Sequence, residues 1–493
     1  MLRSLILFVF ALYSVGATAH PRKYWVIFKD KGQANTAASL DRPLYSPYVS
    51  ALKKEQLPII CQSKWLNAVS TIMEPQDSAR LLSYPFIAQI RPLNQHLQLM
   101  RSHIASPPGL EKDQYAFNQM HGQAFADKGL NGTGVRIGVI DAGYIDANVK
   151  PSLKTIFEHQ HVMATKDFIS PWKADLYQSP ETFQDWHGTE VLECIGGIFE
   201  KGKQQKGFAP NANYYLARTD HGNQEYRGEE DYWVQALEWL DSMNVRLVNS
   251  SLGYAKGFDD PAENYRPADM DGQTSMISKV AEIATTKKGM YLVVSAGNEG
   301  DDPTWRVVSA PADAEHVLSV GATEYAYGNK FEYSAQGPQQ LDYIKPDIAC
   351  YASSGTSFSA PIITGLVACM LQYKPQLTNE QITAIIQKSS NLHQFPNNFI
   401  GYGVPNCRRI LDMMNDKGSL FPNKLLVAEE KTITLPIQHE EALIFQKKDE
   451  RNVVSQSIKK VKRKGLTLKR MQGISRTTVV TPDEVYEVKW AAL

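Results

Sequence analysis

Between Gly134 and about residue 390, short apolar runs alternate with segments in which apolar residues recur every three or four positions. The short β-branched runs predict buried strands, and the three-to-four spacing predicts amphipathic helices. The predicted strands are residues 135–140, 213–217, 245–249, 290–295 and 317–320. The predicted helices cover residues 191–198, 233–240, 276–283, 362–371 and 378–386. This alternation is typical of an α/β domain, in which a parallel sheet is covered by helices on both faces.

Before and after this domain, the spacing of apolar residues along the chain is different. Strand patterns at 23–28 and 86–90, an apolar run at 58–73 and a helical pattern at 74–82 predict a small α+β module. Residues 102–113 contain Pro107-Pro108-Gly109 and charged residues, which is typical of an exposed linker where proteases cut. After about residue 419 the helical patterns stop, and short strands are predicted at 432–436, 442–445, 477–480 and 485–490. We therefore predict an α+β module at 20–110, an α/β domain at 111–418 and a small β-rich domain at 419–493.

The first nineteen residues have the pattern of an export signal. Arg3 precedes an apolar run at 5–15, and Ala17-Thr18-Ala19 fits a small-x-small cleavage site. The run is shorter than the roughly 20 apolar residues that a membrane-spanning helix needs. We therefore expect a cleaved signal peptide at 1–19 and a secreted or periplasmic protein. No later stretch of the sequence predicts a membrane span.

Composition and charge limit the kinds of molecule that the protein is expected to bind. Hydrophobic residues make up 43% of the chain, which favours a large folded core, and 52 basic residues balance 52 acidic ones. A balanced charge gives no reason to expect a nucleic acid or an anionic membrane as the main partner. The basic run at 459–464 has no interleaved aromatic residues, so we interpret it as a solvated hairpin tip.

The cysteines are odd in number and widely spaced, with no paired metal-binding pattern. They are Cys61, Cys194, Cys350, Cys369 and Cys407. We expect buried thiols that pack as small apolar side chains, no disulfide framework and no metal site.

Three polar segments stand at the ends of predicted apolar elements. Asp141 directly follows a buried strand, His187 begins a helix beside Gly188, and Ser357 leads into the apolar helix at 362–371. The carboxyl edge of a parallel sheet is where α/β proteins bind ligands, and the start of a helix favours negative charge. Each residue alone is a common turn or cap residue. Together, in the order Asp, His, Ser, they follow one known order of a hydrolytic triad.

These segments resemble the subtilisin-like serine proteases, or subtilases. The resemblance covers about residues 134–390. It rests on Val-Ile-Asp-Ala-Gly at 139–143, His-Gly-Thr at 187–189, Ser-Ala-Gly-Asn-Glu-Gly at 295–300 and Gly-Thr-Ser-Phe-Ser-Ala-Pro at 355–361. Asn-Ser-Ser-Leu-Gly at 249–253 and Lys-Pro-Asp at 345–347 also fit. The resemblance implies a subtilisin-like fold and a serine endopeptidase that needs no cofactor for its chemistry, and it leaves open whether structural calcium is bound.

The resemblance also implies roles for individual residues. Ser357 would attack the scissile carbonyl, His187 would act as general base and then acid, and Asp141 would orient the imidazole. Asn298 and the Ser357 backbone N–H would hold the oxyanion. Residues 251–253 (Ser251, Leu252 and Gly253) would pair with the substrate backbone, which favours broad specificity for protein and peptide substrates.

The family commonly carries an inhibitory propeptide that assists folding, and residues 20–110 are similar to it in size and element order. We expect the enzyme to remove its own propeptide by cutting in the linker. A folding assistant is physically reasonable because large parallel sheets fold slowly.

Two features depart from the family pattern. Ala142 follows Asp141 where many relatives have Ser or Thr, and the connection from Asp347 to Gly355 is short. A catalytically impaired binding protein on the same fold is therefore the alternative function. A lipase or esterase is disfavoured, because such enzymes use a Gly-x-Ser-x-Gly turn and the order Ser, acid, His.

Overall fold

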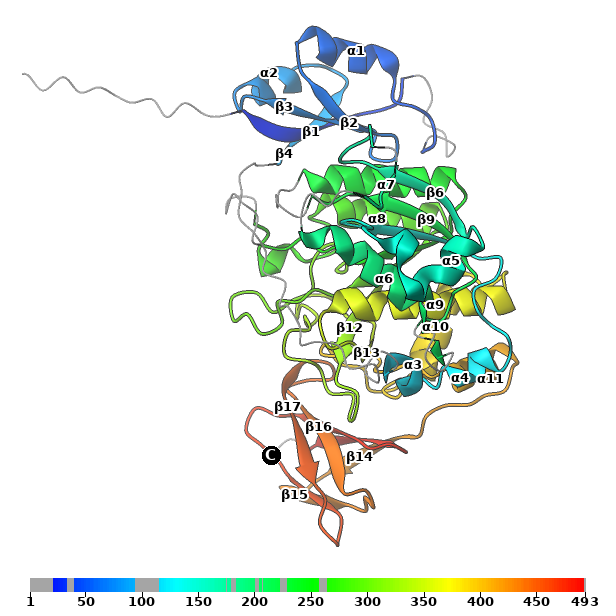
Figure 1. Cartoon of the computed structure of the whole chain (residues 1–493). Helices are drawn as coiled ribbons and strands as arrows, with labels where there is room; N and C mark the ends of the chain where they lie inside the picture. Colours follow the sequence, from blue (N-terminus) through cyan, green and yellow to red (C-terminus); the bar gives the residue numbers. More distant parts are fainter. Residues whose placement is uncertain are drawn as a thin grey trace, which may run out of the picture. The chain divides into compact units, whose positions relative to one another are not determined.

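The chain folds into two compact units, Met1–Asn94 and Gln95–Leu493 (Figure 1). The computed structural model describes residues 21–32, 40–93, 115–173, 175–178, 183–199, 204–205, 207–221, 228–256 and 264–491. The predicted signal peptide and the predicted linker at 102–113 lie outside the described residues. The exact domain boundaries stay predictions.

The first unit is a four-stranded antiparallel sheet, in the order β2-β3-β1-β4, with two helices. Its elements are β1 Arg22–Phe28, α1 Ser46–Lys54, β2 Ile59–Ser63, β3 Ala68–Met73, α2 Asp77–Leu82 and β4 Ile87–Leu93. Tyr24, Val26 and Phe28 alternate along β1 into a core that also contains Leu52 of α1. The predicted α+β module is confirmed, although α1 was not predicted from the sequence.

The second unit is built on a seven-stranded sheet in the order β13-β12-β11-β10-β5-β9-β6. Every neighbouring pair is parallel. The strands are β5 Arg136–Asp141, β6 Val162–Asp167, β9 Asn213–Arg218, β10 Leu247–Ser250, β11 Tyr291–Ser295, β12 Leu318–Thr323 and β13 Ile348–Tyr351. The predicted parallel α/β sheet is therefore confirmed.

Helices cover both faces of this sheet (Figure 1). The main helices are α6 His187–Gly196, α7 Glu229–Ser242, α8 Met276–Lys287, α9 Thr356–Tyr373, α10 Asn379–Ser389 and α11 Cys407–Met414. Shorter elements are α3 Tyr115–Gln119, α4 Gln123–Ala126, η3 Ala147–Val149, η4 Pro151–Leu153, α5 Lys154–Glu158, η5 Phe183–Trp186, β7 Ile198–Phe199, β8 Gln204–Gln205 and η7 Pro267–Asp269. Along β5, Ile137 and Val139 pack into the core that contains α9, whereas Gly138 lies against Leu240 of α7.

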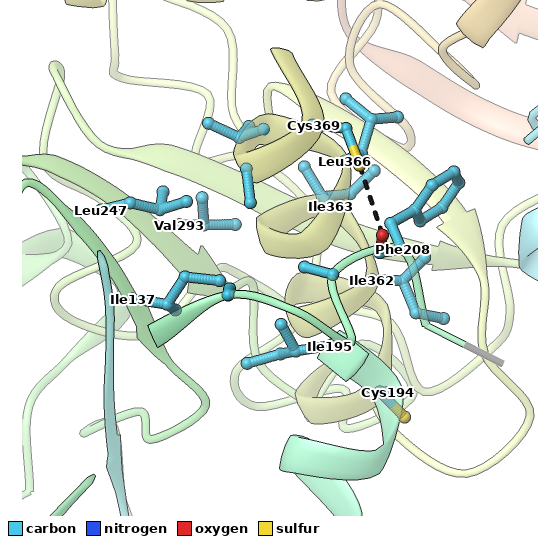
Figure 2. Close-up of a cluster of buried hydrophobic side chains, with 14 of the residues drawn as sticks. Ile137, Cys194, Ile195, Phe208, Leu247, Val293, Ile362, Ile363, Leu366 and Cys369 are labelled. Carbon is cyan, nitrogen blue, oxygen red and sulfur yellow. Dashed lines mark hydrogen bonds between the residues drawn. The ribbon is translucent and has the colours of Figure 1, made fainter. Parts of the chain in front are cut away.

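Helix α9 runs through the centre of the core (Figure 2). Its side chains Ile363 and Leu366 are fully buried, as are Leu247 of β10 and Val293 of β11. Full burial of an aliphatic side chain of this size contributes about 1.5–3 kcal/mol. Because Ser357 lies in the first turn of this helix, the core holds the serine segment firmly in place.

Helix α9 also bears on the expectation about membrane spans. By length and composition it could cross a bilayer, and it alone among the helices of the described residues passes that test, but 83% of it is buried inside the protein. We did not expect any later stretch to be this long and apolar, but the burial of α9 agrees with the prediction that it does not span a membrane. Its apolar side chains are buried in the core beside the sheet, as in an ordinary central helix.

The sequence predicted the start of α10 correctly but placed the end of α6 too late. Thr378 and Gln381 form the predicted capping box of α10, with Gln381 N donating to Thr378 Oγ1 at 3.2 Å and Thr378 N donating to Gln381 Oε1 at 2.9 Å. In contrast, α6 ends at Gly196, so the predicted helix at 191–198 was too long. A Cβ on Gly197 would lie 2.5 Å from Glu193 O, and the chain turns out into β7 there.

All five cysteines are buried thiols outside any disulfide. Burial raises the pKa of the thiols of Cys350, Cys369 and Cys407. Protonated, enclosed thiols of this kind pack as small apolar side chains, as predicted.

The C-terminal region is β-rich, as predicted. It contains a five-stranded sheet in the order β14-β20-β19-β16-β17 and the pair β15-β18. The strands are β14 Asn423–Ala428, β15 Thr432–Leu435, β16 Glu441–Lys447, β17 Val453–Lys460, β18 Leu466–Lys469, β19 Arg476–Val480 and β20 Val485–Trp490. Leu443 and Phe445 of β16 share a buried cluster with Ala349 of β13. In the basic run, Lys459 and Lys460 end β17, and residues 462–464 form an exposed turn.

Candidate active site

Asp141 and His187 meet at the carboxyl edge of the large sheet. Asp141 is the last residue of β5 and is completely buried, and His187 is the first residue of α6. His187 Nδ1 lies 2.6 Å from Asp141 Oδ1. The two segments approach at backbone distance, because a Cβ on Gly188 would lie only 2.4 Å from Gly143 O. Glycine at position 188 therefore allows the aspartate loop to reach the helix start.

The two oxygens of the Asp141 carboxylate are not equally satisfied. Oδ1 accepts a hydrogen bond from Ala142 N at 2.8 Å and also faces His187. Within the described residues, Oδ2 is buried and has no hydrogen-bond partner. Ala142 has no hydroxyl to offer, so the sequence departure at this position coincides with an unsatisfied carboxylate oxygen.

Ser357 lies in the first turn of α9 and its side chain is directed towards β10. Its hydroxyl donates to Ser251 O at 3.1 Å, and in return Ser251 Oγ donates to Ser357 O at 2.9 Å. Asn249 Nδ2 donates to Ser251 Oγ at 3.0 Å, and Thr364 Oγ1 donates to Asn249 Oδ1 at 2.9 Å. This buried chain of hydrogen bonds ties the serine segment to the end of β10.

His187 approaches the same segment through a ring contact. Its imidazole centroid lies 5.5 Å from that of Phe358, the residue after Ser357. The structure does not join the Ser357 hydroxyl to His187 by a hydrogen bond, since that hydroxyl bonds to Ser251 O. A catalytic hydrogen bond is often absent or long in an unliganded enzyme and forms only with substrate.

Asn298 lies in the turn after β11, exposed to solvent, beside the start of α9. Its Oδ1 accepts from Thr356 N at 2.9 Å and from Thr356 Oγ1 at 3.0 Å. With the amide oxygen occupied in this way, the amide nitrogen is oriented away from Thr356. A Cβ on Gly355 would lie 3.5 Å from Asn298 Nδ2, so this donor lies beside the loop that carries Ser357.

Residues 251–253 follow β10 directly and belong to no helix or strand. In the described part of the chain, no hydrogen bond pairs the backbone groups of Leu252 or Gly253. The next residue does pair, because Tyr254 N donates to Ala310 O at 2.8 Å. Leu252 and Gly253 thus offer free backbone donors and acceptors next to Ser357.

The charges around His187 favour its protonated form. Burial lowers the pKa of His187, but Asp141, and to a smaller extent Glu190 and Asp220, raise it, and the net pKa lies above the ordinary value of 6.5. Neither Glu190 nor Asp220 was singled out from the sequence. Glu190, three residues after His187 on the same helix, is the one that helical spacing could have indicated.

The short connection from Asp347 to Gly355 consists mostly of strand β13. The strand spans Ile348–Tyr351 and leaves three residues before Gly355. The Tyr333 hydroxyl donates to Ala352 O and thereby supports this loop. Asp347 itself is buried and accepts from Lys345 Nζ at 2.8 Å, so the predicted Lys-Pro-Asp segment is structural. No group of three or more metal-ligating side chains occurs among the described residues.

Comparison with known sequence families gives two matches. Residues 132–403, more than half of the chain, match the subtilase family. Residues 32–106 match the Peptidase S8 propeptide domain of Bacteroidota.

Individual relatives are distant but cover much of the chain. Subtilisin E of Bacillus subtilis (strain 168) is 24% identical over 378 residues, which are 75% of this chain and 85% of that protein. Subtilisin BL of Lederbergia lenta is 26% identical over 296 residues, which are 57% of this chain and 94% of that protein.

Two solved structures share the fold. The epidermin leader peptide processing serine protease of Staphylococcus aureus has a TM-score of 0.57 at 18% identity, over 81% of this chain and 100% of that one. Fervidolysin from Fervidobacterium pennivorans, a keratinolytic enzyme related to subtilisin, has a TM-score of 0.56 at 17% identity, over 96% of this chain and 74% of that one.

Proposed function

This chain belongs to the subtilase family of serine proteases, and from that premise we propose that it is a secreted endopeptidase whose catalytic triad is Asp141, His187 and Ser357. One observation carries the proposal above all. The buried carboxylate of Asp141 holds His187 Nδ1 at 2.6 Å, at the sheet edge, and Ser357 lies in the first turn of α9. That geometry orients an imidazole whose other nitrogen is available for proton transfer.

In the proposed reaction, Ser357 Oγ attacks the scissile carbonyl while His187 Nε2 takes its proton. The resulting imidazolium is stabilised by Asp141 and passes the proton to the leaving amine, which gives an acyl-enzyme. Water then attacks the acyl-enzyme while His187 takes a proton from it. His187 returns that proton to Ser357 Oγ, and the acid product is released. Every proton is carried by side chains of this chain, so we propose that the chemistry requires no cofactor.

For this reaction the Ser357 hydroxyl must leave Ser251 O and turn towards His187. We propose that rotation about the Cα–Cβ bond of the serine, to another staggered position, redirects its hydroxyl. The hydrogen bond from Ser251 Oγ to Ser357 O keeps the backbone in place during that rotation. We propose that substrate binding triggers the rotation.

The negative oxygen of the tetrahedral intermediate needs hydrogen-bond donors. We propose Asn298 Nδ2 and the Ser357 backbone N–H as these donors, supported by the fixed orientation of the Asn298 amide. The position of the Ser357 N–H in the first turn of α9 adds the positive end of the helix dipole.

We propose that residues 251–253 bind the peptide substrate by adding it to the sheet edge. The unpaired backbone of Leu252 and Gly253 supports this role. Backbone pairing gives affinity with limited side-chain selectivity, so broad specificity for proteins and peptides is expected.

The N-terminal unit is a subtilase propeptide domain by sequence match. We propose that it inhibits the enzyme, assists its folding and is removed by the enzyme's own cut in the linker at 102–113. Subtilisin relatives and the export pattern at 1–19 support a location outside the cytoplasm.

Labelling with a fluorophosphonate tests the proposed function directly. An activated serine reacts with the phosphorus centre, so we expect a single stoichiometric label on Ser357, found by mass spectrometry. The matched control is Ser353→Ala, which removes an exposed hydroxyl of the same loop and should leave labelling unchanged. If the processed protein takes no label and cleaves no peptide, it is a binding protein on a subtilase fold instead.

The charges around His187 predict the pH dependence. The general base must be neutral, and its pKa is raised, so kcat/KM should fall on the acid side with a midpoint above 6.5. Glu190→Gln removes a negative charge that raises the pKa of His187, and should move the midpoint down by roughly 0.2–0.7 pH units at low salt. Glu158→Gln, an exposed acid on α5, is the control. A midpoint unmoved in Glu190→Gln would contradict the assigned charge effect.

A further inference from the structure

Arg218 is a buried arginine at the sheet edge where Asp141 and His187 meet. It is the last residue of β9, and its Cα partners are Asp141 in β5 and Asp167 in β6. Its side chain is only 5% exposed. A buried guanidinium is stabilised only where acceptors surround it, so its contacts define its role.

Those contacts reach the two segments that carry Asp141 and His187. Arg218 Nε donates to Ala142 O at 2.9 Å, directly after Asp141. One terminal nitrogen donates to Asp185 Oδ1 at 3.1 Å, two residues before His187. The other donates to Asp167 Oδ2 at 3.1 Å.

We propose that Arg218 is a positioning residue that joins the Asp141 loop to the segment preceding His187, and so sets the geometry of the Asp141–His187 pair. The inference rests on the proposed function. Around Arg218 the two segments also meet through their backbones, since Ile145 N donates to Asp185 O at 3.0 Å. A Cβ on Gly143 would lie 2.6 Å from Asp185 Cα, so no side chain fills this junction. Thr189 Oγ1 also donates to Ile145 O at 2.7 Å, and Trp186 Nε1 donates to Asp146 Oδ2 at 3.3 Å. Arg218 differs from these in bonding to both segments from a third element, β9.

Such a residue is needed because the carboxylate of Asp141 has few hydrogen-bond partners. Within the described residues, Oδ1 is hydrogen-bonded to Ala142 N and His187 Nδ1, and Oδ2 has no hydrogen-bond partner. A hydroxyl at position 142 would have held the carboxylate locally. Without it, the orientation of Asp141 depends on where the loop after β5 is held, and Arg218 holds that loop through Ala142 O.

Arg218 also places a positive charge beside Asp167 and Asp185, near the segments that carry Asp141 and His187. The acidic groups facing the imidazole are Asp141 from β5, Glu190 from α6 and Asp220 after β9. Asp185 in the segment before α6 is paired with Arg218, and Phe358 on α9, which contacts the imidazole, is uncharged. Removal of the Arg218 charge takes one positive charge away from Asp167 and Asp185, and the added net negative charge stabilises the imidazolium.

The test compares Arg218→Met and Arg218→Lys in the processed enzyme. Methionine keeps the apolar length but loses the hydrogen bonds and the charge, so kcat should fall by about 10–100-fold while KM changes less than about threefold. The acid limb of kcat/KM should move up by roughly half a pH unit or more. Lysine keeps the charge without the planar fork, so it should restore the pH limb but only part of kcat. A folded Arg218→Met enzyme with wild-type kcat and pH limb overturns the inference.

A second pair of variants decides the matter if Arg218→Met fails to fold. Asp185→Ala removes a bond to the His187 segment, whereas Asp167→Ala removes a bond from the same arginine that leads to neither catalytic segment. Asp185→Ala should lower kcat by about tenfold and move the acid limb down, and Asp167→Ala should cost clearly less at equal thermal stability. Equal losses of kcat in both variants would overturn the inference. If the unmodified enzyme cleaves peptides, any of these failures concerns Arg218 alone and leaves the proposed function intact.

Discussion

Ser357→Ala is expected to abolish peptide hydrolysis, with kcat reduced by about 10⁶-fold, the scale established for subtilisin. The physical reason is that no other hydroxyl can replace the attacking oxygen, because the neighbouring Ser359 is buried and donates to Thr356 O at 3.0 Å. The same change should leave the secreted precursor uncut in the linker at 102–113. Mass spectrometry and N-terminal sequencing of the secreted protein measure both effects.

The Ser357→Ala protein also controls for folding. Removal of the hydroxyl takes away one hydrogen bond to Ser251 O, so the unfolding free energy should change by no more than about 1.5 kcal/mol. Addition of a small amount of active enzyme should trim the variant at the same position as the wild type. Normal trimming of the isolated variant by itself would refute self-cleavage, and undiminished hydrolysis would refute Ser357 as the nucleophile.

Asn298→Ala is expected to lower kcat by about 10²–10³-fold with little change in KM, as the loss of the corresponding donor does in subtilisin. The amide nitrogen of Asn298 would contact the substrate oxygen only after that oxygen becomes negative. Its loss should therefore raise the barrier without weakening substrate binding. Steady-state kinetics on a peptide substrate measures the two constants separately.

Thr356→Val provides a matched comparison for Asn298. It removes the hydroxyl that donates to Asn298 Oδ1 at 3.0 Å and keeps the backbone N–H that donates to the same atom. The amide stays but is less firmly oriented, so kcat should fall by about tenfold or less. If Asn298→Ala changed KM and left kcat intact, Asn298 would be a substrate-binding residue and the proposed oxyanion role would be wrong.

Much of the fold could be predicted from local patterns. Buried parallel strands need continuous apolar runs, and the helices that cover them need apolar stripes, so both signals survive in the sequence. The capping box of Thr378 and Gln381 is equally local and was identified correctly. The end of α6 was placed two residues late, because Ile198 continues the apolar spacing although Gly197 breaks the helix. Only the close backbone approach at the glycines shows where the helix stops.

For the candidate site, too, some features could be predicted from the sequence and others could not. Sequence patterns singled out Asp141, His187 and Ser357, since each lies at the end of a strand or the start of a helix, and the resemblance to the subtilases added Asn298. They did not predict that the Ser357 hydroxyl bonds to Ser251 O, or that Thr364 supports Asn249. These contacts join residues more than a hundred positions apart, which no local period records.

By itself, the sequence determined which segments become strands and helices and which polar residues stand at their ends, because burial imposes a period on neighbouring residues. Only the tertiary structure decided which ends meet. The strand order places β9 beside β5, and this brings Arg218 to Ala142 O and Asp185. A charged residue at the end of an apolar strand is ordinary in a sequence. Its partners come from other elements, so its role depends on a strand order that local patterns do not contain.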